Sequence, residues 1–391
     1  MEKEKNEILD IVQIVTIKDI SILYKGDDPA TYIEKVSLEE NDFPLITQKN
    51  LYSPGDKVVY IQPDYNLPDI ELFESFIRPG GDPSKSILGS KNRIRAKKFA
   101  FHLGNGESVY SVGILLPLLV VEKYISDNKL KGDNLTEKLG VYKYEEPEPI
   151  NGGKQNSGST FPSGMYKTDE PNWNNVSKSA VFPGEYVGTV KSDGSSTTTY
   201  YSKYDEGICS RNMKKPLTIK KVIGKRKLNF IDKIKKFFGS KIDLRLFETV
   251  DNDDKFVILL KSYLEKLKNY CADNKLFLAL RGEANGQTWK GSGNKNNPDA
   301  KNNENVKFFG IDDLSSGRSI KLGELEFDRI CTELELNRCE IVFKGYFETK
   351  EDLILKCEEY FKNNLIEGIV IRNFDSTFSA KYMSLEYDSK K

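Results

Sequence analysis

Short runs of β-branched and apolar residues recur through the first third of the chain. Ile11 to Ile20 is one such run, Lys57–Ile61 is a second and lies between prolines, and Ser108 to Val121 supplies at least one more. Runs of this kind between turn residues predict strands. Because the turns come at irregular intervals, residues 8 to about 140 predict a small β domain of the Greek-key barrel type.

Helical and extended patterns alternate in the carboxy-terminal half. Phe256 to Tyr270 carries apolar residues at helical spacing and leads into a predicted strand at Leu276–Leu280. A capping-box-like start at Thr349–Asp352 predicts a second helix that ends near Asn364. An apolar strand then follows Glu367. This alternation predicts an α+β domain with a mostly antiparallel sheet.

The composition changes between these two patterns. Residues 145 to 165 run from Glu-Pro-Glu-Pro into a stretch rich in Asn, Gly and Ser, which is the composition of a linker. We therefore expect a first domain at residues 1–145, a linker at 146–165 and a second domain at 166–391. A chain of 391 residues, 38% of them hydrophobic, is long enough to bury a core in each domain.

The apolar runs are too short for a membrane protein. The longest, Val112 to Val121, has ten residues and is interrupted by Pro117, whereas a spanning helix needs about 20. The amino terminus is charged and has no apolar signal core, so secretion is not expected either. We expect an intracellular protein, cytoplasmic or nuclear, with no membrane partner and no evident obligate protein partner.

Cysteine and histidine usage narrows the possible chemistry. The five cysteines show no close paired spacing, which indicates reduced thiols and argues against a structural zinc site. His102 is the single histidine, which argues against a histidine metal cluster and a Ser-His-Asp triad. Any catalysis therefore rests on lysine, arginine and carboxylate side chains.

Charge is unevenly distributed although the formal net charge is zero. Between Lys214 and Lys241 the chain has eleven Lys or Arg residues and one acid, Asp232. Such a block can guide a phosphate backbone by counterion release. The alternative is a solvated helix face, and the sequence leaves both open.

One strand end places an amine beside a carboxylate. Val187 to Thr197 has the pattern of a strand that ends in a tight turn, with Gly194 supplying the backbone freedom that the turn needs. If the backbone is still extended at Lys191, period-2 alternation points Lys191 and Asp193 to the same side. That pair suits a nucleophile and a metal-bound phosphate. The alternative is the ordinary end of a hairpin.

The segments that follow occur in a recognisable order. They are Ser210-Arg211-Asn212, Arg281-Gly282-Glu283, Phe308-Phe309-Gly310-Ile311-Asp312, Glu367-Gly368-Ile369-Val370-Ile371-Arg372 and Ala380-Lys381. With Lys191-Ser192-Asp193-Gly194, this series resembles the motifs of the covalent nucleotidyltransferases. Within that group, the chain is most similar to ATP-dependent RNA ligases with an amino-terminal OB domain.

The resemblance implies a fold and an activity. The fold is an OB-like β-barrel followed by an ATP-grasp-like nucleotidyltransferase domain. The activity is RNA ligation, as in RNA repair: nicked or broken RNA with 3′-OH and 5′-phosphate ends is joined through a lysyl-AMP intermediate and an RNA-adenylate. In the OB domain, a basic groove would bind RNA. Its charges would come from Lys91, Arg93, Arg95, Lys97 and Lys98, for which the alternative is a solubilising loop.

The resemblance also assigns roles to individual residues. Lys191 would carry AMP, Lys381 would neutralise the α-phosphate, and Glu283 would accept hydrogen bonds from the ribose hydroxyls. Adenine would stack on the Phe308–Asp312 strand. The residues expected to bind the nucleotide are Val190, Lys191, Arg211, Glu283, Phe309, Ile311 and Lys381.

A metal ion is expected beside the nucleophile. A lysine amine attacks only after it has lost its proton, so its usual pKa of about 10.4 has to fall, and burial or a nearby cation lowers it. We therefore expect a divalent ion held by Asp193 and Glu367, directly or through water. Hard oxygen ligands suit Mg or Mn.

Three positions depart from the motifs of these ligases. Asn172 stands where the family has an arginine, Ile311 where it has an aromatic residue, and Met383 where it has a second basic residue. A catalytically inactive nucleic-acid-binding module is therefore one alternative. Because only ten residues follow Lys381, no carboxy-terminal OB domain is expected, which argues against mRNA capping enzymes and most DNA ligases. An ATP-dependent DNA ligase is the other alternative.

Overall fold

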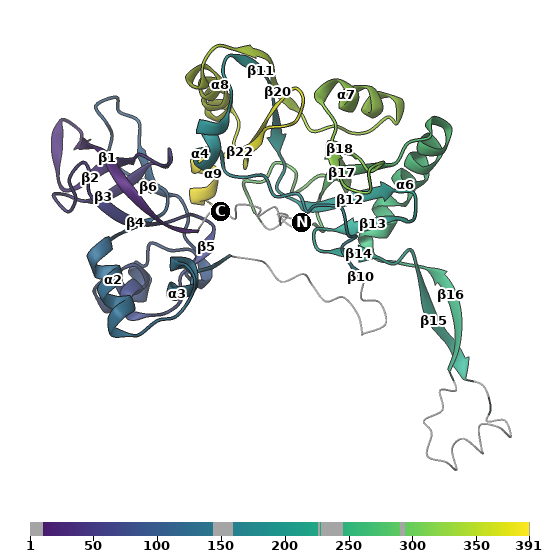
Figure 1. Ribbon diagram of the computed structural model, residues 1–391, viewed down its shortest axis with the longest axis horizontal. Coiled ribbons are helices and arrows are strands. Elements are labelled where there is room, and N and C mark those ends of the chain that lie inside the picture. Colours follow the sequence, from purple (N-terminus) through teal and green to yellow (C-terminus); the bar gives the residue numbers. More distant parts are fainter. Residues whose placement is uncertain (1–10, 144–158, 226, 228–244, 290–293, 391) are drawn as a thin grey trace.

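The amino-terminal part of the chain is built on a five-stranded antiparallel sheet (Figure 1). The computed structural model describes residues 11–143, 159–225, 227, 245–289 and 294–390. In sheet order the five strands are β3 (Leu45–Gln48), β2 (Asp28–Leu38), β1 (Val12–Lys25), β4 (Lys57–Ile61) and β8 (Ile114–Pro117). The predictions of strands at Ile11 to Ile20 and at Lys57–Ile61 are confirmed.

Smaller elements surround this sheet. The predicted strand in Ser108 to Val121 is present as β7 and β8, but the chain becomes helical from Leu118 onward. Two short strand pairs join β5 to β9 and β6 to β7. The bounds of the remaining elements are β5 (Tyr65–Asn66), β6 (Lys97–Phe99), β7 (Val109–Ser111), β9 (Tyr142–Lys143), α1 (Glu74–Ile77), α2 (Leu118–Asp127), α3 (Leu135–Leu139), η1 (Glu71–Phe73), η2 (Pro79–Gly81), η3 (Pro83–Lys85) and η4 (Ser90–Asn92).

Two large sheets and one two-stranded sheet lie in the described residues of the carboxy-terminal part. The larger has seven strands, in the order β10 (Ser159–Thr160), β14 (Met213–Lys215), β13 (Glu206–Ser210), β12 (Ser195–Tyr201), β17 (Leu278–Asn285), β18 (Asn305–Asp313) and β19 (Ile320–Lys321). The smaller has four, in the order β20 (Ile341–Phe347), β11 (Gly184–Lys191), β21 (Gly368–Asn373) and β22 (Ser379–Met383). Every ladder between named strands is antiparallel. The prediction of a mixed, mostly antiparallel α+β fold is therefore confirmed.

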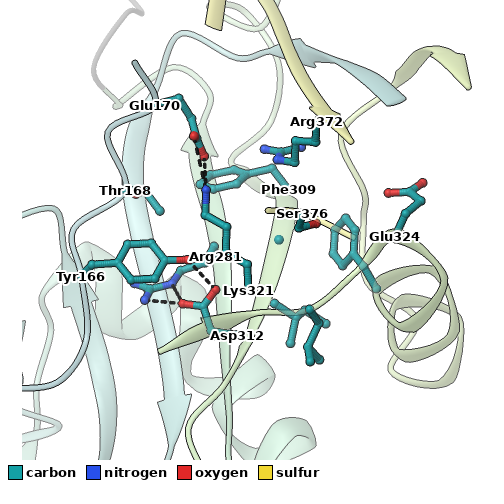
Figure 2. Close-up of a pocket in the computed structure, with 14 residues that line it drawn as sticks. Tyr166, Thr168, Glu170, Arg281, Phe309, Asp312, Lys321, Glu324, Arg372 and Ser376 are labelled. Atoms are coloured by element: carbon teal, nitrogen blue, oxygen red, sulfur yellow. Dashed lines mark hydrogen bonds and ion pairs between the residues drawn. The ribbon is translucent and has the colours of Figure 1, made fainter. Parts of the chain in front are cut away.

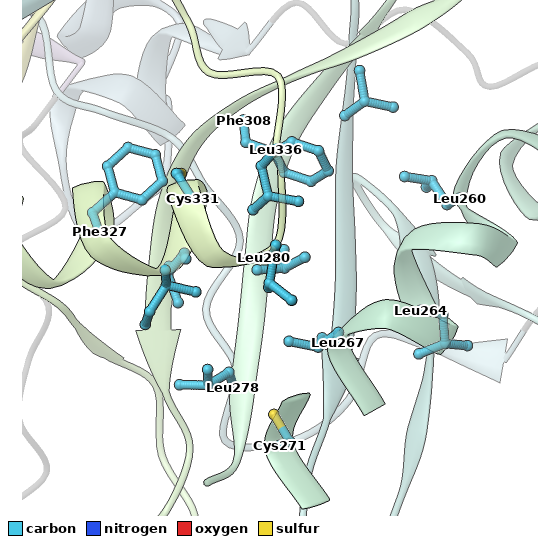
Figure 3. Packing of buried hydrophobic residues seen from close by; sticks show 14 of the residues in the cluster. Leu260, Leu264, Leu267, Cys271, Leu278, Leu280, Phe308, Phe327, Cys331 and Leu336 are labelled. Atoms are coloured by element: carbon cyan, nitrogen blue, oxygen red, sulfur yellow. The ribbon is translucent and has the colours of Figure 1, made fainter. Parts of the chain in front are cut away.

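Helices cover these sheets. They are α4 (Trp173–Val176), η5 (Ser177–Ser179), α6 (Lys255–Asn274), α7 (Glu324–Glu333), α8 (Lys350–Asn363) and α9 (Leu385–Lys390). The largest core cluster of the described residues lies where α6 and α7 pack against the seven-stranded sheet, and Figure 3 shows Leu267 of α6 near Leu280 of β17. Phe308 contributes its ring to this core and is 0% exposed.

The helical patterns read from the sequence are confirmed. The apolar residues at Phe256 to Tyr270 belong to α6, and the helix predicted after Thr349 is α8. The Thr349 side chain accepts a hydrogen bond from the Asp352 backbone N–H at 3.2 Å, as a capping residue does. The strand predicted at Leu276–Leu280 begins later, at Leu278, and continues through Glu283 to Asn285.

The basic block forms strands where it is described. Residues 218–225 form β15 (Thr218–Lys225), which pairs with β16 (Arg245–Asp251) in a hairpin that projects from the rest of the molecule (Figure 1). The alternative of a solvated helix face is wrong for these residues. Residues 226 and 228–241 of the block lie outside the described residues.

The expected linker is described only at its end. Residues 146–158 lie outside the described residues, and Ser159–Thr160 already pairs with β14 in the seven-stranded sheet. All five cysteines lie in described segments as buried free thiols, in agreement with their unpaired spacing. In the described part of the chain, no helix combines the length and the apolar character needed to cross a membrane.

Candidate active site

The chain passes from one carboxy-terminal sheet to the other at Lys191. Strand β11 of the four-stranded sheet ends at Lys191, and β12 of the seven-stranded sheet begins at Ser195. The two strands do not pair with each other, so the alternative of a hairpin is wrong. Lys191 therefore lies at the junction of two sheets, where side chains from both can surround it.

Gly194 is needed at this junction because the backbone here passes very close to β17. Its backbone does not adopt the left-handed conformation, so the prediction that it supplies turn freedom is wrong. A Cβ atom at this position would lie 2.4 Å from the Ala284 carbonyl oxygen and 2.4 Å from Asn285 Oδ1. Glycine therefore allows the crossover, the segment of residues 192–194 that joins β11 to β12, to pack directly against β17.

Carboxylates surround the Lys191 amine. Lys191 lies opposite Gly368 in the β11–β21 ladder, and its Nζ forms an ion pair with the neighbouring Glu367. Burial alone would lower the pKa of Lys191, but the charges of Glu367, Glu283 and Asp193 outweigh it and raise the pKa above its usual value. The protein without ligands therefore stabilises the protonated amine.

Asp193 is held from several directions. Its side chain is buried, and its Oδ2 accepts a hydrogen bond from the Tyr387 hydroxyl at 2.9 Å. The Asn297 side-chain amide donates to the Asp193 backbone carbonyl at 2.8 Å, and Asn294 Nδ2 lies 3.4 Å from Oδ2. These asparagines belong to the polar segment between β17 and β18, of which residues 290–293 lie outside the described residues.

Oxygen atoms dominate the surroundings of Lys191. Within the described residues, no three His, Cys, Asp or Glu side chains gather into a complete metal-binding group. Asp193 and Glu367 nevertheless both act on the same amine. Two buried oxygens near the crossover, Ser192 Oγ and Asn285 Oδ1, have no hydrogen-bond partner in the described part of the chain. Hard oxygen donors of this kind fit Mg or Mn better than zinc.

A second charge cluster gathers around Asp169. Lys381 Nζ lies 3.4 Å from Asp169 Oδ1, Arg211 Nη2 lies 3.3 Å from Oδ2, and Lys143 forms a further ion pair with the same carboxylate. Burial alone would raise the pKa of Asp169, but Lys381, Lys143 and Arg211 lower it to about 2. The structure thus brings the predicted Arg211 and Lys381 together around an acid that the sequence analysis did not single out.

Asn172 has a structural role at the same place. Its side chain accepts a hydrogen bond from the Asn174 N–H at 3.0 Å and caps α4. The preceding Pro171 carbonyl accepts from the Lys381 backbone N–H at 2.8 Å. The segment that carries Asp169 is therefore tied directly to β22.

A pocket opens between the two sheets (Figure 2). Phe309 lines it and is half-buried, and the Arg372 guanidinium carbon lies 5.9 Å from the Phe309 ring centre. Ile311 also reaches this pocket, but it is 1% exposed and packs in the core beneath. Val190 packs in the core of the four-stranded sheet, and its N–H donates to the Glu340 carbonyl at 2.9 Å.

A buried ion pair forms the floor of this pocket. Arg281 Nη2 lies 2.6 Å from Asp312 Oδ2, and the Tyr166 hydroxyl donates to Asp312 Oδ1 at 2.8 Å (Figure 2). Arg281 also donates to Thr198 Oγ1 at 2.9 Å. In the sequence, Arg281 and Asp312 stand out only as parts of motifs. Their shared burial and their contacts show that they hold β12, β17 and β18 together.

Comparison with known protein families identifies the family of this chain. Residues 184–383, which contain β11, Lys191, Glu283, Glu367 and Lys381, match the family described as RNA ligase. The chain belongs to the RNA ligase family. A search of curated proteins finds no match for this chain.

Similarity to solved structures extends beyond residues 184–383 and covers nearly the whole chain. An RNA ligase from Naegleria gruberi with PPi has a TM-score of 0.67 and 21% identity, with 96% of this chain and 97% of that chain covered. A mutant of the same ligase with ATP and Mn has a TM-score of 0.69 and 20% identity, with 97% and 99% covered. Another mutant with AMP and Mn has a TM-score of 0.67, 21% identity and coverage of 97% and 98%. At this identity the comparison shows that the two RNA ligases share a fold.

Proposed function

We propose that this member of the RNA ligase family is ATP-dependent and works through an AMP covalently bound to Lys191. The observation that supports this most directly is the position of the Lys191 amine at the junction of two sheets, with Glu367, Glu283 and Asp193 acting on it. Three acids acting on one half-buried amine are more than a single ion pair needs, which favours a chemical role for Lys191. Membership of the family supports RNA as the substrate.

The reaction would proceed in three transfers. The Lys191 Nζ attacks the α-phosphorus of ATP, an N–P bond forms and pyrophosphate leaves. The RNA 5′-phosphate then takes AMP from Lys191, which regains its free amine. Finally the 3′-OH attacks the activated 5′-phosphate, AMP leaves, and a 3′-5′ phosphodiester joins the ends of the nicked or broken RNA.

Asp193 and Glu367 would hold Mg or Mn, directly or through water. Their carboxylate oxygens, which both act on the Lys191 amine, fit a hard divalent cation. When bound, the cation supplies positive charge that offsets the phosphate charge and opposes the effect of the carboxylates on the pKa of Lys191. The protein's own part is to hold the Lys191 amine in line for attack, and its carboxylates retain the proton of that amine until ligands bind.

The remaining predicted residues would bind the nucleotide between the sheets. Glu283 would accept hydrogen bonds from the ribose, Phe309 would stack on adenine, and the backbone around Val190 would border the base. Lys381 and Arg211 would contact phosphate and nucleotide groups. Before ATP binds, Asp169 would hold these two basic side chains in place. The Phe309 ring is favoured over Ile311 for stacking because Ile311 is almost fully buried.

The two parts of the chain would correspond to two domains. We assign residues 1–145 to an OB-like domain and residues 166–391 to an ATP-grasp-like nucleotidyltransferase domain, separated by a linker at 146–165. Exposed Lys97 and Lys98 on β6 are suited to RNA contact, and Lys98 Nζ lies 5.7 Å from the Tyr110 ring centre. Arg93 instead forms an ion pair with Asp64.

Incubation with α-labelled ATP and Mg or Mn tests the proposal. Covalent label is expected on the wild-type protein and on Lys356→Ala, whose lysine lies on the exposed face of α8, but not on Lys191→Ala. Sealing of nicked duplexes with RNA or DNA on the 3′-OH side then tests the substrate. Equal sealing of all-DNA nicks supports the DNA ligase alternative, and absence of label with either metal supports the inactive binding module.

A further inference from the structure

The short helix at the end of the described chain contacts both parts of the molecule. Helix α9 (Leu385–Lys390) follows β22 directly and lies between the amino-terminal sheet and the active-site region (Figure 1). Leu385 packs against the core cluster that includes Val15, Ile17 and Tyr60. Asp388 Oδ2 accepts a hydrogen bond from the Ala96 N–H at 2.8 Å, across 292 residues of sequence. This helix is therefore anchored on the amino-terminal part by one apolar and one polar contact.

The same helix reaches the site through a tyrosine. Tyr387 is 1% exposed, and its hydroxyl donates to Asp193 Oδ2 at 2.9 Å. A buried hydroxyl requires an acceptor, and here the acceptor is a carboxylate two residues from Lys191. The hydrogen bond fixes one oxygen of Asp193 in a low-dielectric environment, where a charge-assisted bond holds its geometry firmly.

We propose that Tyr387 is a positioning residue for the Asp193 carboxylate, and that α9 couples this position to the docking of the amino-terminal part. The inference rests on the proposed function, which assigns Asp193 to the metal-binding site. Leu385, Tyr387 and Asp388 lie within four consecutive residues. A shift of the amino-terminal sheet that displaces Leu385 and Asp388 therefore displaces the Tyr387 hydroxyl and the Asp193 carboxylate as well. Groups behind a metal ligand orient it and tune its affinity for the metal.

Removal of one hydroxyl tests the positioning role. Tyr387→Phe keeps the buried ring and deletes only the donor to Asp193. The matched control is Tyr186→Phe, which deletes the hydroxyl of an equally buried tyrosine that donates to the Val181 carbonyl at 2.7 Å. We expect Tyr387→Phe to need about 10-fold more Mn for half-maximal labelling of Lys191, with Tyr186→Phe unchanged. Identical Mn dependence of wild type and Tyr387→Phe overturns the proposal.

The protein without metal or nucleotide provides a second measurement. In a crystal structure of free Tyr387→Phe, the Asp193 carboxylate should turn away from its wild-type orientation, while Glu367 stays paired with Lys191. An Asp193 side chain that keeps the wild-type orientation contradicts the positioning role, whatever the labelling rate.

Variants of Asp388 test the coupling. Asp388→Ala removes the acceptor for the Ala96 N–H and should raise the Mn requirement in the same direction, although the Tyr387 hydroxyl is intact. Asp388→Asn keeps an oxygen acceptor and should restore most of the wild-type behaviour. The effects of Tyr387→Phe and Asp388→Ala should be less than additive in the double variant, because both act through Asp193. An unchanged Mn dependence in Asp388→Ala overturns the coupling.

Failure of this inference can be told apart from failure of the proposed function. If the wild-type protein takes no label at Lys191 with either metal, the proposed function fails. If it is labelled, and Tyr387→Phe is labelled with the same Mn dependence and the same Asp193 orientation, only the role of Tyr387 fails.

Discussion

Lys191 and Glu367 form an ion pair although 176 residues separate them in the chain. The pairing follows from the sheet, because Gly368 lies opposite Lys191 in the β11–β21 ladder and Glu367 precedes it. With Glu283 and Asp193 also acting on the amine, the unliganded site favours the ammonium form. The first chemical step therefore requires the loss of a proton that the protein alone retains.

The charge on Glu283 should contribute, after that on Glu367, to the pH dependence of this step. Labelling of the wild-type protein should become faster with rising pH, because the neutral fraction of Lys191 grows. Glu283→Gln removes a charge that raises the pKa of Lys191, so its profile should shift to lower pH. Single-turnover labelling at saturating ATP, from about pH 6 to about pH 9, measures this shift. Glu326→Gln on the exposed surface of α7 is the control, and an unshifted Glu283→Gln profile would falsify the prediction.

Addition of one methyl group at Gly194 should disturb the junction of the sheets. The new Cβ atom would meet the Ala284 carbonyl oxygen and Asn285 Oδ1, each at 2.4 Å. Gly194→Ala should therefore lower the free energy of unfolding by roughly 1–3 kcal/mol and abolish labelling. Gly224→Ala in β15 is the matched control, because its Cβ would meet only Leu246 Cδ1, at 4.0 Å. Urea denaturation and ATP labelling compare the two variants, and equal behaviour contradicts the explanation.

Adjacent phenylalanines should respond differently to truncation. Phe309 lines the pocket, so Phe309→Ala should raise the KM for ATP roughly 10-fold, in line with stacking energies of about 1–3 kcal/mol per base, with little loss of stability. Phe308 is 0% exposed in the main core, so Phe308→Ala should cost about 3–5 kcal/mol of stability. Steady-state kinetics and thermal unfolding distinguish these effects. A Phe309→Ala variant with wild-type KM excludes the ring as the adenine platform.

Removal of the buried ion pair between Arg281 and Asp312, below the pocket, should destabilise the domain. Arg281 and Asp312 side chains are each 2% exposed and 2.6 Å apart. Arg281→Met leaves the Asp312 charge buried without its cation and should cost about 3–5 kcal/mol, whereas the double variant Arg281→Met and Asp312→Leu should recover most of that loss. Chemical denaturation measures the free energy of unfolding of both variants. Arg329→Met, on the exposed face of α7, should leave the unfolding midpoint unchanged.

Local patterns predicted the elements that carry the reacting groups. Strand β21 after Glu367, helix α8 after Thr349 and the end of a strand at Lys191 follow from spacing and caps, which are properties of neighbouring residues. The motif order then indicated which side chains meet. That Lys191 joins two sheets could not be predicted, because the pattern of a hairpin and that of a crossover are the same until the distant partner strands are known.

Contacts between residues far apart in the chain could not be predicted from the sequence patterns either. Arg93 was expected to contact RNA, yet it pairs with Asp64 beside the anchored end of α9. Asp169 and Tyr387 could not be singled out, because acids and tyrosines with ordinary neighbours are common in any chain. Their roles depend on residues more than 40 positions away, Arg211 and Lys381 in one case and Asp193 in the other.

The crossover between β11 and β12 restricts how the pocket can open. Only Ser192, Asp193 and Gly194 connect the two strands, a length of chain that spans roughly 10 Å when fully extended. The two sheets therefore cannot separate far beside Lys191, whatever movement occurs elsewhere in the domain. The amine and its carboxylates should keep their positions while a nucleotide enters and leaves.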